Sequence, residues 1–293
     1  ERARHGVVVG GGLIGIELAE MLHGRGLGVT LLVRESSYWN NVLPPEESAL
    51  VNAEIRAAGL DLRLSTELAE VVDDGGGRAS AVVTTGGERI DCQVVGLTAG
   101  VSPNTGRARA AGLEVGRGIR VDASLRTGEA GVWAAGDCAE VVRADHEPLV
   151  EQVWYTGRAQ GRLAAESILA GAEGSTPPDY APGTWFNSAK FLDLEYQTYG
   201  RVLPDAAGQG QLVWSAGRRL LRLAHEDGRV VGFNAMGLRW RHRVAEAWID
   251  EGREVPWVIE HLADAGFDGE LEPRHEAAMA AELGRQYGAV EVS

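Results

Sequence analysis

Residues 7–22, VVVGGGLIGIELAEML, decide the fold of this chain. Three valines lead into Gly10, Gly12 and Gly15, which have the spacing G-x-G-x-x-G, and a helical pattern of apolar residues follows. In this motif the first glycine permits a tight turn, the second lets the backbone approach a pyrophosphate, and the third lets helix and strand pack closely. The free N–H groups at the start of such a helix favour an anion. The stretch predicts a dinucleotide-binding turn, although the glycine triplet alone is also compatible with an ordinary strand-to-helix turn.

The residues after this helix complete a βαβ unit. Glycines at 24, 26 and 28 end the helix, and residues 29–33 read as a second buried strand. Arg34 follows that strand at the place where NAD-specific folds usually carry an acid for the ribose 2′-hydroxyl. An arginine there would pair with a 2′-phosphate, so the sequence favours NADPH over NADH. Two alternatives stay open: Arg34 is a solvated loop charge, or Glu35 accepts a hydrogen bond from the ribose.

Composition excludes several classes of protein. The chain has 293 residues, is 44% hydrophobic and carries a net charge of −14, which argues against a nucleic-acid or anionic-membrane partner because the overall field repels phosphates. No apolar run reaches the roughly 18 residues that span a bilayer, and no leader is recognisable. The two cysteines and seven histidines have no metal-binding spacing. We expect a soluble, cytoplasmic protein without a metal site.

The remaining pattern predicts alternating strands and helices, followed by a sheet and a group of helices. Helices are expected at 44–59, 151–169, 242–251, 256–265 and 273–287, and strands at 60–64, 68–72, 81–85, 93–97, 131–135, 191–199, 212–214, 220–224 and 229–234. Residues 171–182 are rich in Gly, Pro, Ser and Thr and indicate a linker.

Two further motifs follow the glycine turn. Residues 96–104, GLTAGVSPN, read as a strand that ends in small residues and a proline. Residues 131–141, GVWAAGDCAEV, read as a short apolar strand that delivers Gly136 and Asp137 at its end. A carboxylate directly after a glycine can approach a sugar-like chain and accept its hydroxyl hydrogen bonds.

With these motifs in this order, the sequence resembles the FAD-dependent pyridine nucleotide-disulfide oxidoreductases, a family that includes ferredoxin reductases and NADH oxidases. The family's G-x-G-x-x-G-x-E matches Gly10, Gly12, Gly15 and Glu17, its A-T-G segment corresponds to Ala99 and Gly100, and its second FAD motif corresponds to Ala135, Gly136 and Asp137. The resemblance implies that Asp137 holds the ribityl chain of FAD. It also implies that Glu17 orients the nicotinamide as the catalytic residue.

The resemblance assigns further residues to the cofactors. Leu13 stands where several members place an aromatic lid over the flavin, and Ile14 lies beside it in the nucleotide motif. The helix after residue 150 would point its N-terminus at the flavin pyrimidine, which places Glu151, Gln152 and Trp154 nearest the ring. The cofactors expected are FAD with NADP or NAD.

The fold implied is α/β: a Rossmann-like NAD(P)-binding domain at 1–100, the C-terminal part of an FAD-binding domain at 101–172, and an α+β interface domain at 180–293. The activity implied is hydride transfer from NAD(P)H to FAD and onward to a small molecule or redox protein, in a homodimer of the kind common in the family. Arg239, Arg241, His242 and Arg243 could receive an acidic redox protein such as a ferredoxin, or could be a solvated surface.

One departure leaves a second function open. The family normally begins with another βαβ unit for the ADP half of FAD, and Glu1 stands directly before the second nucleotide motif. We therefore expect a fragment, or a chain whose other half is a separate polypeptide. The alternative function is a non-catalytic NAD(P)H sensor or a subunit of a redox complex, and Asp137 argues against it because a protein that binds only a dinucleotide needs no ribityl motif. A single-cofactor dehydrogenase ranks last.

Overall fold

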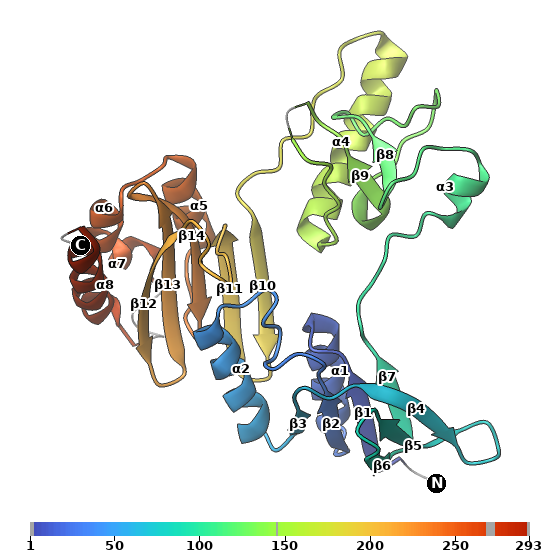
Figure 1. Cartoon of the computed structure of the whole chain (residues 1–293). Coiled ribbons are helices and arrows are strands. Elements are labelled where there is room, and N and C mark those ends of the chain that lie inside the picture. The colour runs from blue at the N-terminus through green and yellow to red at the C-terminus, as the bar shows by residue number, and fades with distance from the viewer. Residues whose placement is uncertain (1–2, 145, 268–272, 292–293) are drawn as a thin grey trace. The chain divides into compact units, whose positions relative to one another are not determined.

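A computed structural model describes residues 3–144, 146–267 and 273–291. The chain divides into two compact units (Figure 1): one contains residues 1–100 and 184–293, and the other contains residues 101–183. Each unit is described by itself. The assignment of segments to nicotinamide, flavin and interface domains stays a prediction.

The first unit begins with a parallel sheet of four strands. They are β1 (His5–Val9), β2 (Gly28–Leu32), β3 (Asp61–Arg63) and β7 (Val94–Leu97), in the order β3-β2-β1-β7. Helix α1 (Leu13–His23) joins β1 to β2, and α2 (Pro45–Ala57) joins β2 to β3. Val7 and Val8 are fully buried, as expected for a strand with both faces covered. The predicted α/β fold is confirmed.

A small antiparallel sheet is inserted between β3 and β7. Its strands are β4 (Leu68–Asp73), β5 (Ala79–Thr84) and β6 (Arg89–Asp91). Of these three strands, only β6 was not expected from the sequence. Its three residues are too few to show an alternation of polar and apolar side chains.

A five-stranded antiparallel sheet forms the rest of the first unit. Its strands are β10 (Phe186–Phe191), β11 (Leu194–Gly200), β12 (Gly210–Ala216), β13 (Arg219–Glu226) and β14 (Arg229–Met236), in the order β10-β11-β14-β13-β12. The prediction of one strand over residues 191–199 is wrong. The chain reverses at Leu192, which has φ +58°, and Phe191 pairs with Leu194. The two-residue loop is Leu192-Asp193; Asp193 is a turn residue, but nothing in the sequence marks Leu192 for a positive φ.

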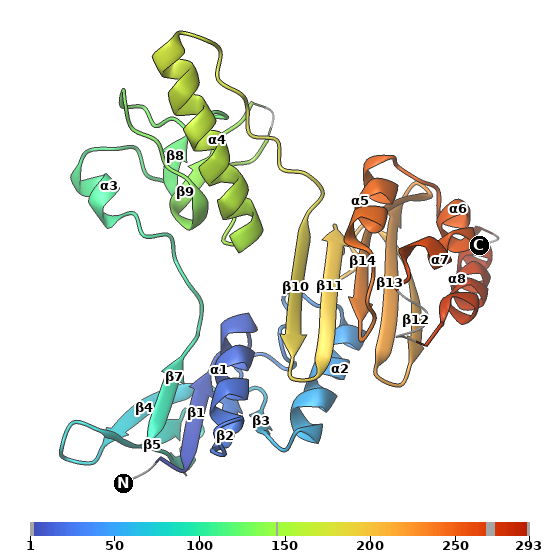
Figure 2. The same ribbon diagram turned by 180° about the vertical axis from the view of Figure 1, so that it is seen from behind.

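Four helices follow: α5 (His242–Asp250), α6 (Val255–Glu260), α7 (Leu262–Ala265) and α8 (Glu276–Glu291). They lie on one side of the five-stranded sheet (Figure 2). The single helix predicted at 256–265 is wrong, because the chain breaks at His261, where φ is −107°. The His261 ring stacks on the Trp257 ring, and its Nδ1 lies 2.7 Å from the Trp257 carbonyl oxygen.

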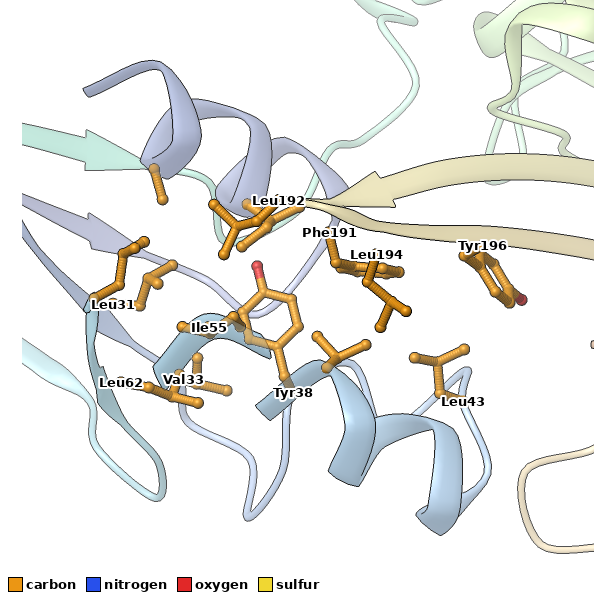
Figure 3. Packing of buried hydrophobic residues seen from close by; sticks show 14 of the residues in the cluster. Leu31, Val33, Tyr38, Leu43, Ile55, Leu62, Phe191, Leu192, Leu194 and Tyr196 are labelled. Carbon is orange, nitrogen blue, oxygen red and sulfur yellow. The ribbon is translucent and has the colours of Figure 1, made fainter. Parts of the chain in front are cut away.

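The parallel sheet and the five-stranded sheet share one hydrophobic core. Leu31, Val33 and Tyr38 from the nucleotide-motif half meet Phe191 and Leu192 of the β10–β11 hairpin (Figure 3). All five side chains are buried. Residues 1–100 and 184–293 are therefore packed together as one unit.

The second unit contains α3 (Gly106–Ala110), β8 (Ile119–Val121), the 3₁₀ turn η1 (Gly136–Cys138), β9 (Ala139–Val141) and α4 (Trp154–Glu173). The strand predicted at 131–135 is wrong: Trp133 makes only an isolated bridge with Arg126, and the strand follows the Gly136 turn instead of preceding it. Helix α4 begins three residues later than predicted and ends at Gly174, which has φ +68°. Among the described residues, no helix is long and apolar enough to cross a membrane.

Candidate functional site

The turn between β1 and α1 requires glycine at two positions. Gly10 has φ +127°, and a Cβ atom there would lie 2.4 Å from the Thr98 carbonyl oxygen. A Cβ at Gly15 would lie 2.5 Å from the Gly10 carbonyl oxygen. At Gly12, by contrast, a Cβ would meet no atom within 4 Å. The first and third glycines thus permit the turn and the close helix packing, while the second leaves open space for a ligand.

A buried tyrosine, Tyr38, holds this turn through a hydrogen bond to its backbone. The Tyr38 hydroxyl donates a hydrogen bond of 2.8 Å to the Gly12 carbonyl. The Tyr38 backbone N–H donates to Asn52 Oδ1, and Ser48 Oγ donates to the Tyr38 carbonyl. Burial raises the pKa of Tyr38 well above its usual value, so the phenol stays protonated and remains a donor. Sequence reasoning missed Tyr38, since nothing local to residues 36–40 signals a contact with the glycine motif.

Thr98 ties the end of β7 to the same turn. Its N–H and its hydroxyl both donate to the Val9 carbonyl, at 2.8 and 2.9 Å. Ala99 and Gly100 follow it and are exposed, and Gly100 has φ +116°. The small residues predicted at this position therefore lie directly beside the glycine turn.

A cavity of about 570 Å³, which we call the glycine-turn cavity, opens at the carboxyl ends of the parallel strands. It is lined by Val9, Gly10, Gly11, Gly12, Leu32, Arg34, Glu35, Trp39, Asn41, Thr66, Glu67, Leu68, Leu97, Thr98, Ala99 and Gly100. Its volume is within the range of small-molecule sites, and its place is where open α/β sheets bind ligands.

Two oppositely charged residues stand at one wall of this cavity. Arg34 Nε and Nη2 donate to Glu35 Oε1, the shorter distance being 2.7 Å. The hydrogen bond and the charge of Glu35 raise the pKa of Arg34. The Arg34 side chain is 72% exposed and the Glu35 side chain 30% exposed. Both residues that the sequence offered for the ribose or its 2′-phosphate thus lie at the cavity, paired with each other.

Three predicted nucleotide-site residues lie elsewhere. Glu17 is exposed on α1 and, with Glu20 and Met21, lines a separate shallow hollow. Leu13 packs against the hydrophobic core, and Ile14 is 56% exposed. None of the three lines the glycine-turn cavity.

Residues that the sequence did not single out complete the cavity wall. Trp39 has φ +55°, a conformation uncommon for a bulky residue, and its ring lies 5.9 Å from that of Phe191. Asn41, Thr66 and Glu67 join it from the loops after β2 and β3. The positive φ of Trp39 could not be read from the sequence, since no glycine or asparagine occupies that position.

In the second unit, Gly136 forms a turn pressed against α4. Gly136 has φ +77°, and a Cβ built on Gly157 would lie 3.6 Å from the Gly136 Cα. The Gly136 N–H donates to Gln160 Oε1 at 2.8 Å. Asp137 is exposed, and within the described part of the chain its carboxylate accepts no hydrogen bond. A free carboxylate on a tight glycine turn fits a hydroxyl-bearing ligand such as a ribityl chain.

The three residues predicted at the start of α4 are placed differently from one another. Glu151 is buried, and its Oε2 accepts from the Tyr180 hydroxyl at 2.6 Å and from Gln160 Nε2 at 3.4 Å. Gln152 is half-buried. Trp154 is 68% exposed and lies edge-on to Tyr155. The Glu151 carboxylate therefore faces the interior of its unit.

No group of metal-ligating side chains occurs among the described residues. Cys92 is buried, Cys138 is half-buried, and both are free thiols.

Comparison with protein families gives a match over more than half of the chain. The model of the family described as pyridine nucleotide-disulphide oxidoreductase matches residues 1–161. The nitric oxide reductase FlRd-NAD(+) reductase of Salmonella gallinarum is 29% identical over 217 residues, which are 72% of this chain and 57% of that protein. The 5,5'-dehydrodivanillate O-demethylase ferredoxin reductase subunit of a Sphingobium species is 33% identical over 201 residues, 68% of this chain and 47% of that protein. The chain thus spans about half the length of these curated relatives.

Solved structures show the same fold. A ferredoxin reductase for the CYP199A2 system from Rhodopseudomonas palustris superposes with a TM-score of 0.69 at 26% identity, over 80% of this chain and 56% of that one. A NAD-dependent persulfide reductase from A. fulgidus gives a TM-score of 0.79 at 22% identity, over 99% of this chain and 56% of that one.

Proposed function

Because the chain belongs to the pyridine nucleotide-disulphide oxidoreductase family, we propose that it is an NAD(P)H-dependent flavoprotein oxidoreductase. The observation that carries this proposal is the open space at Gly12 beside a cavity at the carboxyl ends of β1, β2 and β7. In this family a nicotinamide nucleotide supplies a hydride and FAD accepts it. The protein's own part is to bind and orient both cofactors.

In the first unit, the glycine turn would hold the pyrophosphate of the nicotinamide nucleotide. Gly12 supplies the close backbone approach, and Tyr38 fixes the Gly12 peptide through its carbonyl. Arg34 would pair with a 2′-phosphate, which favours NADPH, while Glu35 would accept from a 2′-hydroxyl in NADH. Leu13 and Ile14 are proposed only as neighbours of the nicotinamide half.

The catalytic role of Glu17 depends on the family resemblance alone. Its carboxylate lies on the exposed face of α1, outside the glycine-turn cavity. We propose that it orients the nicotinamide, and that role requires the nicotinamide end of the nucleotide to extend along α1 beyond the cavity.

In the second unit, FAD would be held by the Gly136 turn. Asp137 offers an exposed carboxylate to the ribityl hydroxyls, and Gly136 lets the ribityl chain approach closely. In the first unit, Ala99 and Gly100 are proposed as cofactor-binding residues on the family resemblance alone. Gln152 and Trp154, at the start of α4, are proposed as neighbours of the flavin ring.

The electron acceptor is proposed to be another redox protein. One relative is named as a ferredoxin reductase subunit and another as a reductase acting with nitric oxide reductase FlRd. Arg239 is engaged with Glu195 at 2.7 Å, whereas Arg241 and Arg243 are exposed and form no ion pair with any residue that the structure describes. These two cations would attract an acidic partner. We also propose that two copies of the chain form a homodimer through the interface domain expected at residues 180–293.

Substituting Gly12 tests the nucleotide site directly. A Cβ at this position meets no protein atom within 4 Å, and Gly12 has φ −111°, so Gly12→Val is expected to fold. The new side chain would occupy the space of the pyrophosphate, and we expect the dissociation constant for NADPH to rise at least about tenfold, a loss of roughly 1.4 kcal/mol.

Gly128→Ala is the matched control, since a Cβ there also meets open space. Nucleotide binding is measured by NADPH fluorescence, and flavin reduction by bleaching of the flavin absorption under anaerobic conditions. Equal NADPH affinity of Gly12→Val and the wild type would disprove the proposed site. Nucleotide binding without any flavin binding would favour the sensor instead.

A further inference from the structure

Four residues of the second unit form a continuous buried chain of hydrogen bonds that ends at the proposed flavin turn. The Gly136 N–H donates to Gln160 Oε1 at 2.8 Å, and Gln160 Nε2 donates to Glu151 Oε2 at 3.4 Å. The Tyr180 hydroxyl donates to the same carboxylate oxygen at 2.6 Å. Gln160 is completely buried, and Glu151 and Tyr180 are each 6% exposed. Polar groups this deeply buried are costly unless each is paired.

The direction of these hydrogen bonds is fixed by the carboxylate. An ionised carboxylate only accepts, whereas an amide has one accepting and one donating end. Glu151 therefore holds the NH₂ group of Gln160 toward itself, and the carbonyl end of Gln160 must face Gly136. Burial, and then the hydrogen bond to Glu151, raise the pKa of Tyr180, so this hydroxyl stays a donor.

The residue held by this chain is the one before Asp137. Gly136 has φ +77°, and a Cβ built on Gly157 of α4 would lie 3.6 Å from the Gly136 Cα. Because Gln160 lies on the same helix, its hydrogen bond fixes the Gly136 N–H relative to α4. Asp137 is the next residue, so this hydrogen bond restrains the backbone from which the Asp137 side chain extends.

We propose that Gln160 and Glu151 are positioning residues for FAD: Glu151 orients the Gln160 amide, and Gln160 holds the Gly136 turn so that Asp137 is presented to the ribityl chain. This inference rests on the proposed function. It replaces the prediction that Glu151 contacts the flavin, because the Glu151 carboxylate is engaged inside the unit.

The loss-of-contact test is Gln160→Leu, which keeps the approximate volume and removes both hydrogen bonds. Ser167→Ala is the matched control: Ser167 is equally buried on α4 and accepts a hydrogen bond from Trp133 Nε1 at 3.1 Å, away from the Gly136 turn. Hydrogen exchange of the Gly136 amide is read by NMR without cofactor, and FAD affinity is read by quenching of flavin fluorescence. We expect faster Gly136 exchange and an FAD dissociation constant raised about tenfold in Gln160→Leu only.

An exchange of the two side chains makes the test specific. In the double variant Glu151→Gln/Gln160→Glu, the carboxylate at position 160 can accept from Gly136 and from the amide at 151, and the amide carbonyl at 151 can accept from Tyr180. All partners are again satisfied, so Gly136 protection and FAD affinity should return to within about threefold of the wild type. The single variant Gln160→Glu places two carboxylates side by side and should remain impaired.

The outcomes separate this inference from the proposed function. Fast Gly136 exchange in Gln160→Leu with wild-type FAD affinity would overturn the positioning role and leave the flavoprotein assignment intact. Unchanged Gly136 exchange, or a double variant no better than Gln160→Glu, would also overturn it. Failure to bind FAD when the βαβ unit for its ADP half is also supplied, with normal protection of Gly136, would overturn the flavoprotein assignment itself.

Discussion

A buried ion pair joins the two segments of the first unit, and its removal should be strongly destabilising. Arg222 on β13 donates from Nε and Nη2 to both oxygens of Glu47 on α2, each at 2.7 Å. The same guanidinium also donates to Glu46 at 2.6 Å and to Gln211 at 2.9 Å. The Arg222 side chain is 5% exposed and that of Glu47 is not exposed at all. The perturbation is Arg222→Met, which keeps the length of the side chain and removes its charge.

The expected loss follows from what remains after the substitution. Among the described residues, the Glu47 carboxylate keeps only the hydrogen bond from Asn234 Nδ2, at 3.2 Å, and its side chain has no exposed surface. Removing one partner of a buried pair costs about 3–5 kcal/mol. The double variant Arg222→Met/Glu47→Leu should recover most of this, because a buried pair replaced by apolar residues is often neutral; we expect a residual loss of roughly 1–3 kcal/mol from the unpaired Asn234.

Urea unfolding followed by tryptophan fluorescence measures both quantities. With a slope of about 2–3 kcal/mol per molar, the midpoint for Arg222→Met should fall by roughly 1.5 M. The exposed pair Arg162–Glu166 on α4 is the control, and Arg162→Ala should change stability by less than about 0.5 kcal/mol. Two results would refute the reasoning: a loss of less than about 1 kcal/mol in the free energy of unfolding of Arg222→Met, or a double variant that is less stable than Arg222→Met.

Three further predictions concern the nucleotide site and the pH dependence of stability. Tyr38→Phe removes one of two hydrogen bonds to the Gly12 carbonyl, the other coming from the Ile16 N–H; NADPH fluorescence titration should show a dissociation constant raised about fivefold, and an unchanged value would contradict the supporting role. Arg34→Ala should raise the dissociation constant for NADPH about tenfold and leave that for NADH unchanged. Equal effects on both nucleotides would show that Arg34 does not bind the 2′-phosphate. Burial lowers the pKa of His225 from its ordinary 6.5. In the described part of the chain, neither nitrogen of its ring has a hydrogen-bond partner. The unfolded chain then binds the proton more tightly, so the free energy of unfolding should fall as pH drops below about 6.5, and His225→Leu should reduce that slope in urea titrations.

The parts of the site that sequence predicted are those whose cause is local. Gly15 is required by its approach to the Gly10 carbonyl oxygen within the βα turn, and Gly10 has a positive φ, so the spacing of the glycines was enough to locate the cavity. Arg34 and Glu35 follow β2 directly and both line the cavity. The strands predicted at 220–224 and 229–234 lie within β13 and β14; Asp227 and Gly228, which separate them, are turn residues and have positive φ.

The parts that sequence did not predict depend on contacts between distant segments. Tyr38 reaches Gly12, and Arg222 reaches Glu47 from the other end of the chain. Glu151 was expected at the flavin because the family resemblance places the start of the helix predicted at 151–169 there, yet its partner Tyr180 lies beyond that helix and holds the carboxylate inside the unit. Each of these side chains looks like an ordinary polar residue in the sequence, and only the tertiary partner reveals its role.

The division of the first unit into two separated segments has a consequence for biosynthesis. Residues 1–100 leave the ribosome before residues 184–293, but the side chains that bury Tyr38 and neutralise Glu47 belong to residues 191–222. The nascent N-terminal segment must therefore wait for most of the chain to be translated before its core can close. Such non-local closure slows folding and leaves apolar surface exposed to aggregation in the interval. We expect this segment to depend on chaperones during translation, while residues 101–183, which are contiguous, can complete their own contacts earlier.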